Sequence, residues 1–202
     1  MLVNPSTDSL RGTSILLAAG ASVRFGSDKR NIPFANTTLL QHTVGLYSSV
    51  FYKVLLVLRE QADVNLSSLP ENVEMVIANE ARFGLSQSLR AGVKQALSEP
   101  WIVIGLMDMP YVTKQTLKSL AVRMDSTKAS IIRPRFNKQY GNPVGFKQEC
   151  YSDLCELTGD EGARTLFSTG KFEIDALEVD DRGILIDIDT PEQLKESANL
   201  AP

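Results

Sequence analysis

The chain has 202 residues, of which 43% are hydrophobic and 22% are charged, a composition typical of one globular domain with a full core. Its formal net charge of −3 argues against nucleic acid or an anionic membrane as the main partner. No stretch approaches the roughly 18 apolar residues of a membrane span, and the polar N-terminus lacks the apolar core of a secretory signal. We therefore expect a cytoplasmic protein.

Apolar runs alternate with helical patterns along the first two thirds of the chain. Strands are expected at 14–18, 53–59, 73–78, 101–106 and 129–133, and helices near 39–49, 86–97 and 113–123. Because the strands are continuous apolar runs separated by helices, the pattern predicts a three-layer, Rossmann-like α/β fold. The central sheet should be mostly parallel, with helices on both faces. We read residues 1–12 as a loose N-terminal leader and 1–202 as a single domain.

The pattern becomes rich in turns after about residue 134. A short apolar run at 144–146, helices at 148–157 and 161–168, a strand at 172–179 and a short apolar run at 184–186 are expected. The last helix should begin at Pro191, with Thr190 as its N-cap.

The few cysteines and histidines exclude several kinds of site. Cys150 and Cys155 would point to different faces of a helix, so we expect packing roles and no disulfide. A Ser-His-Asp or Cys-His unit would need the single histidine, His42, which lies in an amphipathic stretch typical of a helix surface. Histidine-rich zinc sites are excluded.

The loop after the first strand, AAGASVRFGSDKRN, raises the question of phosphate binding. Its spacing matches neither the P-loop nor the dinucleotide fingerprint. Small residues would still let backbone N–H groups approach phosphate oxygens, and Arg24 and Lys29 would neutralise them. The alternative is a surface loop with two solvated cations.

Polar residues also follow other strands, where ligands of open α/β sheets bind. Asp108 ends an apolar run, and a carboxylate there is well placed to hold a divalent metal, although it would equally cap a helix near Thr113. Ser86 and Ser88 are able to cap the helix after the third strand, with Arg90 one turn in. A helix N-terminus favours an anion, and the alternative is simply a capped amphipathic helix.

The segment DIDTP places Asp187 and Asp189 two residues apart. On an extended backbone both carboxylates point to one side, which suits a metal ion. Turn chemistry before the helix at Pro191 explains the same residues.

The order of these motifs resembles that of the MobA-like nucleoside-triphosphate transferases and looks closest to the molybdenum cofactor cytidylyltransferases. The resemblance runs from about Ser14 to Leu194 and rests on LAAG-x-S-x-R-F-G-x-x-K, GLSQSLRAG, MDMP, GNPVGF, GDEGAR and DIDTP. It implies the nucleotide-diphospho-sugar transferase type of fold. It also implies transfer of a nucleoside monophosphate from an NTP to a phosphorylated acceptor, with release of pyrophosphate and assistance by Mg²⁺.

The resemblance assigns roles residue by residue. Lys29, Arg24 and Asp108 are implied to be catalytic, the two cations by holding the triphosphate and Asp108 by binding Mg²⁺, with Asp187 as a further metal ligand. The implied nucleotide-binding residues are Leu17, Ala18, Ala19, Gly20, Ser22, Lys29, Asn79, Ser86, Ser88 and Arg90. The implied acceptor-binding residues are Asn142, Pro143, Asp160 and Glu161.

The resemblance also bears on the substrates. Guanylyltransferase relatives usually begin with LAGG and the cytidylyl group with LAAG, so Ala19 favours CTP, and the implied acceptor is a molybdopterin-type cofactor. This chain departs from the pattern after Lys29, where Arg30 and Asn31 replace apolar residues, and the departure bears on the acceptor. A transient contact with a molybdoenzyme is a further implied partner.

Three alternatives stay open from the sequence. They are guanylyl transfer to the same cofactor, nucleotidyl transfer to another acceptor such as a sugar phosphate or methylerythritol phosphate, and a non-catalytic nucleotide-binding accessory protein for molybdoenzymes.

Overall fold

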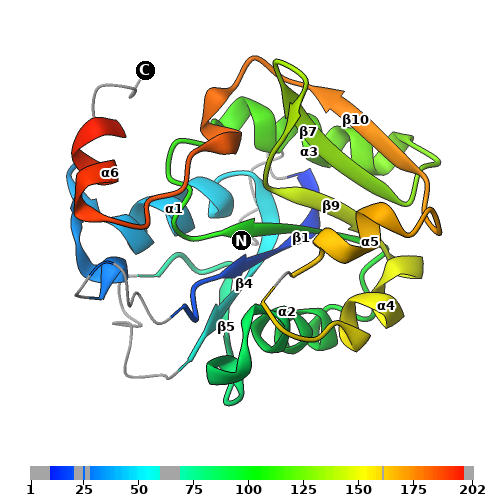
Figure 1. Cartoon of the computed structure of the whole chain (residues 1–202), viewed down its shortest axis with the longest axis horizontal. Coiled ribbons are helices and arrows are strands. Elements are labelled where there is room, and N and C mark those ends of the chain that lie inside the picture. Colours follow the sequence, from blue (N-terminus) through cyan, green and yellow to red (C-terminus); the bar gives the residue numbers. More distant parts are fainter. Residues whose placement is uncertain (1–9, 21–24, 26–27, 60–68, 161, 198–202) are drawn as a thin grey trace, which may run out of the picture.

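A computed structural model describes residues 10–20, 25, 28–59, 69–160 and 162–197 of the chain. Its centre is an eight-stranded sheet with the order β10-β7-β9-β6-β1-β4-β5, and β8 pairs with β7 (Figure 1). The strands are β1 (Leu10–Leu17), β4 (Phe51–Leu58), β5 (Val73–Ile77), β6 (Trp101–Leu106), β7 (Ile131–Phe136), β8 (Gln139–Tyr140), β9 (Val144–Lys147) and β10 (Ile174–Glu178). A separate hairpin joins β2 (Pro33–Phe34) and β3 (Thr37–Thr38).

The sheet is mostly parallel, as predicted. β1 pairs in parallel with β4 and β6, β4 with β5, and β7 with β10. Within the described sheet, β8 and β9 run against their neighbours. The parallel strands therefore deliver their carboxyl ends, and the loops that follow, to one edge.

Helices cover both faces of the sheet, which confirms the three-layer architecture (Figure 1). They are α1 (Leu39–Ser48), α2 (Leu85–Gln95), α3 (Lys114–Ser126), α4 (Tyr151–Glu156), α5 (Arg164–Ser168) and α6 (Pro191–Ser197). Short 3₁₀ helices span Lys29–Asn31, Ala81–Phe83, Gln148–Cys150 and Arg182–Leu185. The inner strands β4 and β6 are mostly continuous apolar runs because both faces of the sheet are covered and each needs its own core.

Successive residues of β1 and β4 point to opposite faces of the sheet and contribute to two separate hydrophobic cores. Leu16 and Leu56 pack with α1 and α3 on one face, whereas Ile15 and Leu55 pack with α2, α4 and α5 on the other. These side chains are fully buried or nearly so. Burial of each contributes roughly 1.5–3 kcal/mol, so the two cores hold the sheet edge and its loops in place.

Helix starts follow the local chemistry of the sequence. Thr38 and Gln41 form a capping box at α1, in which Thr38 Oγ1 accepts from Gln41 N and Gln41 Oε1 accepts from Thr38 N. The predicted N-cap of α6 is confirmed, because Thr190 Oγ1 accepts from Gln193 N at 3.2 Å.

Several predicted boundaries were wrong. β1 begins at Leu10, so residues 10–12, which were read as part of a loose leader, belong to a strand, and residues 1–9 lie outside the described residues. β7 begins at Ile131 and runs on to Phe136, beyond the expected end at 133. The helix expected from 161 starts only at Arg164, since Gly162 takes a left-handed φ of +56° just before it.

Two more segments of the C-terminal third differ from expectation. The helix expected at 148–157 is a 3₁₀ turn followed by the short α4, and most of the apolar run at 184–186 lies in the 3₁₀ helix Arg182–Leu185. Cys150 and Cys155 are both free, as predicted, and Cys150 is buried. None of the helices in the described part of the chain combines the length and apolar character that a membrane span requires.

Candidate functional site

The loops after β1 and β6 leave the sheet side by side. Leu17 and Leu106 are partners in the parallel register, and Met107 N donates to Leu17 O at 3.1 Å. The segment that carries DIDTP joins them, because Ile188 N donates to the carbonyl of Asp108 at 2.8 Å. Segments far apart in the chain therefore meet at the edge where ligands of such sheets bind.

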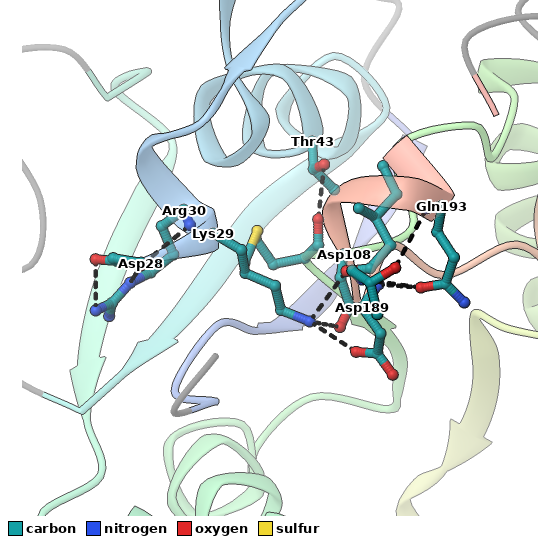
Figure 2. Close-up of polar contacts among 10 residues, drawn as sticks. Asp28, Lys29, Arg30, Thr43, Asp108, Asp189 and Gln193 are labelled. Atoms are coloured by element: carbon teal, nitrogen blue, oxygen red, sulfur yellow. Dashed lines mark hydrogen bonds and ion pairs between the residues drawn. The ribbon is translucent and has the colours of Figure 1, made fainter. Parts of the chain in front are cut away.

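Lys29 reaches this edge from the 3₁₀ helix Lys29–Asn31. Its side chain is 9% exposed, and its ammonium donates to Asp108 Oδ2 at 2.5 Å, to Asp189 Oδ1 at 3.2 Å and to the Ile188 carbonyl at 3.3 Å. Figure 2 shows Lys29 pointing at both carboxylates. The structure thus brings together Lys29 and Asp108, two of the three residues predicted to be catalytic.

Burial and charge set the pKa values of this group. Burial raises the pKa of Asp108, and Asp187 and Asp189 add to the rise, although Lys29 acts in the opposite direction. Burial works to lower the pKa of Lys29, but the charge and hydrogen bonds of Asp108 and Asp189 raise it above its usual value. Lys29 is therefore held as a cation beside the carboxylates.

The residues around Asp108 form a cleft of about 340 Å³, which we call the acidic cleft. Its lining combines an apolar floor, including Leu89, Ile104 and Phe146, with charged and amide side chains. The charged and amide residues are Asp108, Asn142, Asp160, Arg164, Asp187 and Asp189. Predicted metal ligands and predicted acceptor-binding residues thus share one cleft.

Asp108 offers a ligand atom for a divalent cation. Its Oδ1 is buried and has no hydrogen-bond partner among the described residues, whereas Oδ2 is engaged by Lys29. Mg²⁺ is commonly held by one or two carboxylates together with substrate phosphates, so Asp108 with Asp187 or Asp189 fits it. No ready-made cage of three or more histidine, cysteine or carboxylate side chains occurs in the described part of the chain.

A second cleft, of about 450 Å³, adjoins the first, and we call it the cationic cleft. Its described lining residues are Ala19, Gly20, Arg59, Ala81, Arg82, Phe83, Gly84, Leu85, Ser88 and Asp160. Leu85 and Asp160 belong to both clefts. Three residues predicted to bind nucleotide, Ala19, Gly20 and Ser88, therefore lie beside the predicted metal and acceptor residues.

Other predicted nucleotide-binding residues lie away from both clefts. Asn79 is exposed just after β5 and lines neither cleft. Ser86 is fully buried, and its hydroxyl has no hydrogen-bond partner among the described residues. Arg90 donates to the Leu157 carbonyl at 3.3 Å, which ties α2 to the end of α4. The structure does not bring these three residues to the cleft walls.

Some of the remaining predicted site residues are described by the structure, and others lie outside the described part of the chain. Leu17 lines the acidic cleft, and Ala18 is buried where the loop leaves β1. Pro143 is buried beside Asn142, whose backbone N–H donates to Ile184 O at 3.0 Å. Ser22, Arg24 and Glu161 lie outside the described residues.

Two capping alternatives from the sequence were wrong. Neither Ser86 nor Ser88 caps α2: Gly84 takes the N-cap position with φ +120°, and Asp160 Oδ1 accepts from Leu85 N at 3.1 Å. Asp108 does not cap α3, because Thr113 does so through Thr116 N. Asp108 is thereby left to face the acidic cleft.

Sequence reasoning missed residues that build this site. Asp189 contacts Lys29, and only the two-residue spacing from Asp187 pointed to it. Asp181 is buried and accepts hydrogen bonds from Thr113 N, Thr113 Oγ1, Thr116 Oγ1 and Gly183 N, which ties the segment that leads into DIDTP to the start of α3. No local pattern marked Asp181.

Thr43 of α1 was also missed. Its Oγ1 lies 3.0 Å from the carbonyl of Met107 and 3.1 Å from that of Leu39, so it donates to the loop next to Asp108 (Figure 2). Nε2 of the neighbouring residue His42 lies 3.3 Å from the carbonyl oxygen of Pro110, which belongs to the same loop as Met107. Helix α1 therefore positions the Asp108 loop.

The departure at Arg30 and Asn31 has a local structural explanation. Arg30 Nε and Nη2 donate to Asp28 at 2.8 and 2.9 Å, and Asn31 Nδ2 donates to the same carboxylate at 3.2 Å. Asp28 also accepts from Arg30 N and so caps the 3₁₀ helix that carries Lys29. Both residues help hold Lys29 in place.

Comparison with known proteins shows the family. The sequence model described as MobA-like NTP transferase domain matches residues 14–175. The chain belongs to the MobA-like NTP transferase family. It is thus a nucleotidyltransferase by family, and its fold is that of the nucleotide-diphospho-sugar transferases.

Named relatives span several descriptions. The purine catabolism protein PucB of Bacillus subtilis (strain 168) is 30% identical over 192 residues, covering 89% of this chain and 92% of PucB. The nicotine blue oxidoreductase of Paenarthrobacter nicotinovorans is 27% identical and covers 90% and 94%. A probable molybdenum cofactor guanylyltransferase of Nostoc sp. (strain PCC 7120) is 26% identical and covers 90% and 88%.

Solved structures agree with the fold. The Mycobacterium sp. strain JC1 homologue of Mycobacterium tuberculosis Rv0371c superposes with a TM-score of 0.82 at 27% identity, covering 94% of this chain and 96% of that one. The Mycobacterium tuberculosis Rv0371c complex with manganese gives a TM-score of 0.73 at 25% identity, covering 93% and 97%.

Proposed function

We propose that the protein transfers CMP from CTP to the phosphate of a molybdopterin-type cofactor and releases pyrophosphate. The observation that carries this proposal is the contact of Lys29 with Asp108, which lines a cleft that adjoins the one lined by Ala19 and Gly20. A cation and a carboxylate with one oxygen that has no hydrogen-bond partner among the described residues, next to small residues at a strand end, suit a metal-bound triphosphate.

The reaction needs no protein nucleophile, which agrees with the composition of the cleft. The acceptor phosphate attacks the α-phosphorus in line, and the protein supplies position and positive charge. Lys29 would bind triphosphate oxygens, and the backbone at Ala19 and Gly20 would donate to them. Asp108, with Asp187 or Asp189, would hold Mg²⁺, whose chemistry when bound is to neutralise charge on the triphosphate.

The acceptor would enter the acidic cleft from the side of Asn142, Pro143 and Asp160. Asn142 and Asp160 line that cleft together with Asp108, and Asp160 also lines the cationic cleft. Proximity of this kind is what converts the transfer into an effectively unimolecular step.

Guanylyl transfer is the second candidate. Ala19, which favours CTP, lines the cationic cleft, whereas the Nostoc relative is named a guanylyltransferase. A cytoplasmic location, Mg²⁺ as the metal and a transient contact with a molybdoenzyme remain predictions of the sequence.

The test is pyrophosphate release from CTP or GTP in the presence of Mg²⁺ and molybdopterin cofactor, with acceptor-free mixtures as the control. We expect acceptor-dependent release that is faster with CTP. Faster release with GTP would establish the guanylyl alternative. Release with neither nucleotide would contradict the proposal, and nucleotide binding without turnover would favour an accessory protein.

A further inference from the structure

Arg59 and Phe83 lie on the wall of the cationic cleft and have no role in the transfer described above. Arg59 directly follows β4, and its Nη2 donates to the Ala19 carbonyl at 3.3 Å. Phe83 ends the 3₁₀ helix Ala81–Phe83 and is 61% exposed. An arginine beside the nucleotide loop and an exposed ring on one cleft suggest a site for a planar, polar ligand.

The exposed ring of Phe83 has the properties of a stacking surface. The guanidinium of Arg82 lies 4.7 Å from its centroid, and the side chain stays mostly open to solvent on the cleft wall. Every nucleobase has a π face, so stacking on an aromatic ring strengthens binding without distinguishing one base from another. Phe83 would hold a base but would not identify it.

The side chain of Arg59 has the hydrogen-bonding groups needed to distinguish one base from another. A guanidinium has five N–H donors and no acceptor, arranged as a rigid fork that matches two neighbouring acceptors. One donor is used on Ala19, and Nε is buried without a hydrogen-bond partner among the described residues. The donors that remain for a ligand in the cleft are therefore the other N–H groups of the two terminal nitrogens, and the guanidinium has no acceptor beside them.

Nucleobases differ in whether they offer two neighbouring acceptors. Guanine offers O6 and N7, the pair that arginine most often contacts, and cytosine offers O2 and N3. Adenine and uracil instead alternate donors with acceptors along their hydrogen-bonding edges. A donor-only fork thus favours cytosine and guanine over adenine and uracil.

We propose that Arg59 restricts the nucleotide to CTP or GTP by binding the paired acceptors of the base, while Phe83 stacks on that base. This inference rests on the proposed function, because it places the nucleotide in the cationic cleft. The inference limits the nucleotide substrate to CTP and GTP, the two nucleotides that the family resemblance left open.

A purely structural role for Arg59 predicts a different result. If Arg59 only held the loop through the Ala19 carbonyl, its replacement would weaken all four nucleotides by the same factor. If it reads the base, replacement changes the ratio of their affinities. The ratio is therefore the quantity to measure.

The experiment is equilibrium binding of CTP, GTP, ATP and UTP by titration calorimetry, without acceptor. We expect the wild type to bind CTP or GTP at least about tenfold more tightly than ATP and UTP, within the range of a bidentate arginine contact. Arg59→Lys keeps the charge but loses the fork, so this ratio should fall to near one. Phe83→Ala should weaken all four nucleotides alike, and Arg123→Lys, remote from both clefts, should change nothing.

Each contrary outcome has a distinct meaning. If the wild type shows no base preference, or if Arg59→Lys keeps the wild-type preference, Arg59 does not recognise the base. If Phe83→Ala binds all four nucleotides with unchanged affinity, Phe83 does not stack on the base. Should Arg59→Lys unfold, Arg59→Gln, which also loses the fork, is compared with the wild type in the same titrations. Binding of no nucleotide by the wild type overturns both this inference and the proposed function. An Arg59-dependent preference without pyrophosphate release supports the inference and contradicts only the proposed function.

Discussion

The two clefts share a wall at Leu85 and Asp160 but carry opposite charges. The acidic cleft holds Asp108, Asp187 and Asp189, whereas Arg59 and Arg82 line the cationic cleft. A triphosphate is repelled by carboxylates unless cations accompany it, but it is attracted by arginines. From this difference in charge we infer that the cationic cleft suits nucleotide binding and that the acidic cleft suits the metal-assisted transfer.

The clefts also differ in how the chain builds them. At the acidic cleft, Lys29 contacts the lining residues Asp108 and Asp189, so three segments distant in sequence meet there. Most of the cationic cleft comes from two short stretches, 19–20 and 81–88, with Arg59 and Asp160 added. We therefore expect variants at the acidic cleft to affect turnover and those at the cationic cleft to affect binding.

The largest expected effect comes from Asp108→Asn. Removing this charge should lower turnover by at least roughly two orders of magnitude, as when an electrostatic contact to a transition state is lost. Nucleotide preference, measured by calorimetry, should stay unchanged because the cationic cleft is intact. The control is Asp153→Asn, which loses only a surface pair with Lys171. Near-normal turnover in the Asp108 variant would remove Asp108 as the essential metal ligand.

A smaller effect is expected from Thr43→Val, which removes the hydrogen bond to the Met107 carbonyl without changing the side-chain shape. Losing one buried hydrogen bond should lower the free energy of unfolding by about 1 kcal/mol, measured by denaturant titration. Turnover should fall by about tenfold, since the loop beside Asp108 loosens. Ser126→Ala, which removes an exposed back-bond in α3, is the control. Equal stability and turnover in both variants would show that Thr43 does not position the loop.

The smallest effect is expected outside both clefts, at Asp175. Hydrogen bonds from Arg123, at 2.6 Å, and from Thr127 lower the pKa of Asp175 in the folded protein. Its contribution to stability is therefore present above the unfolded value of about 3.9 and is lost as the pH falls through the lower folded value. Asp175→Asn should be slightly less stable than the wild type at pH 7, and the gap should close in acid.

Thermal unfolding from pH 7 down to acid measures this gap. Turnover should be unchanged at neutral pH, because Asp175 lines neither cleft. A stability gap that persisted below the folded pKa would contradict the ionic origin, and a loss of turnover would contradict the separation of this edge from the site.

Local sequence patterns predicted the helices and strands that contribute many buried side chains to the cores. The strand at Trp101–Leu106 was predicted with its observed bounds because a continuous apolar run carries its own signal, and α1 was predicted to within one residue from its amphipathic pattern. Predictions failed at 10–12, which belong to β1, and at 148–168, where short elements depend on tertiary packing and on the left-handed conformation of Gly162.

The site was predictable in part for the same reason. Asp108 and Lys29 each sit at the end of a recognisable local motif, so both were named as functional. The placement of Asn79, Ser86 and Arg90 was not predictable, because the direction of a side chain on a helix or turn depends on what packs against it.

The sequence by itself determined that this chain forms a parallel α/β sheet with a small-residue loop after its first strand and a carboxylate after its central strand. Apolar runs and turn residues encode these features locally. Only the tertiary structure decided that Lys29 contacts Asp108 and Asp189, that Asp160 accepts from the first N–H of α2, and that Asp181 binds the start of α3. The physical reason is that hydrogen bonds and ion pairs between distant segments form only after the two cores fix the sheet, and no local pattern records them.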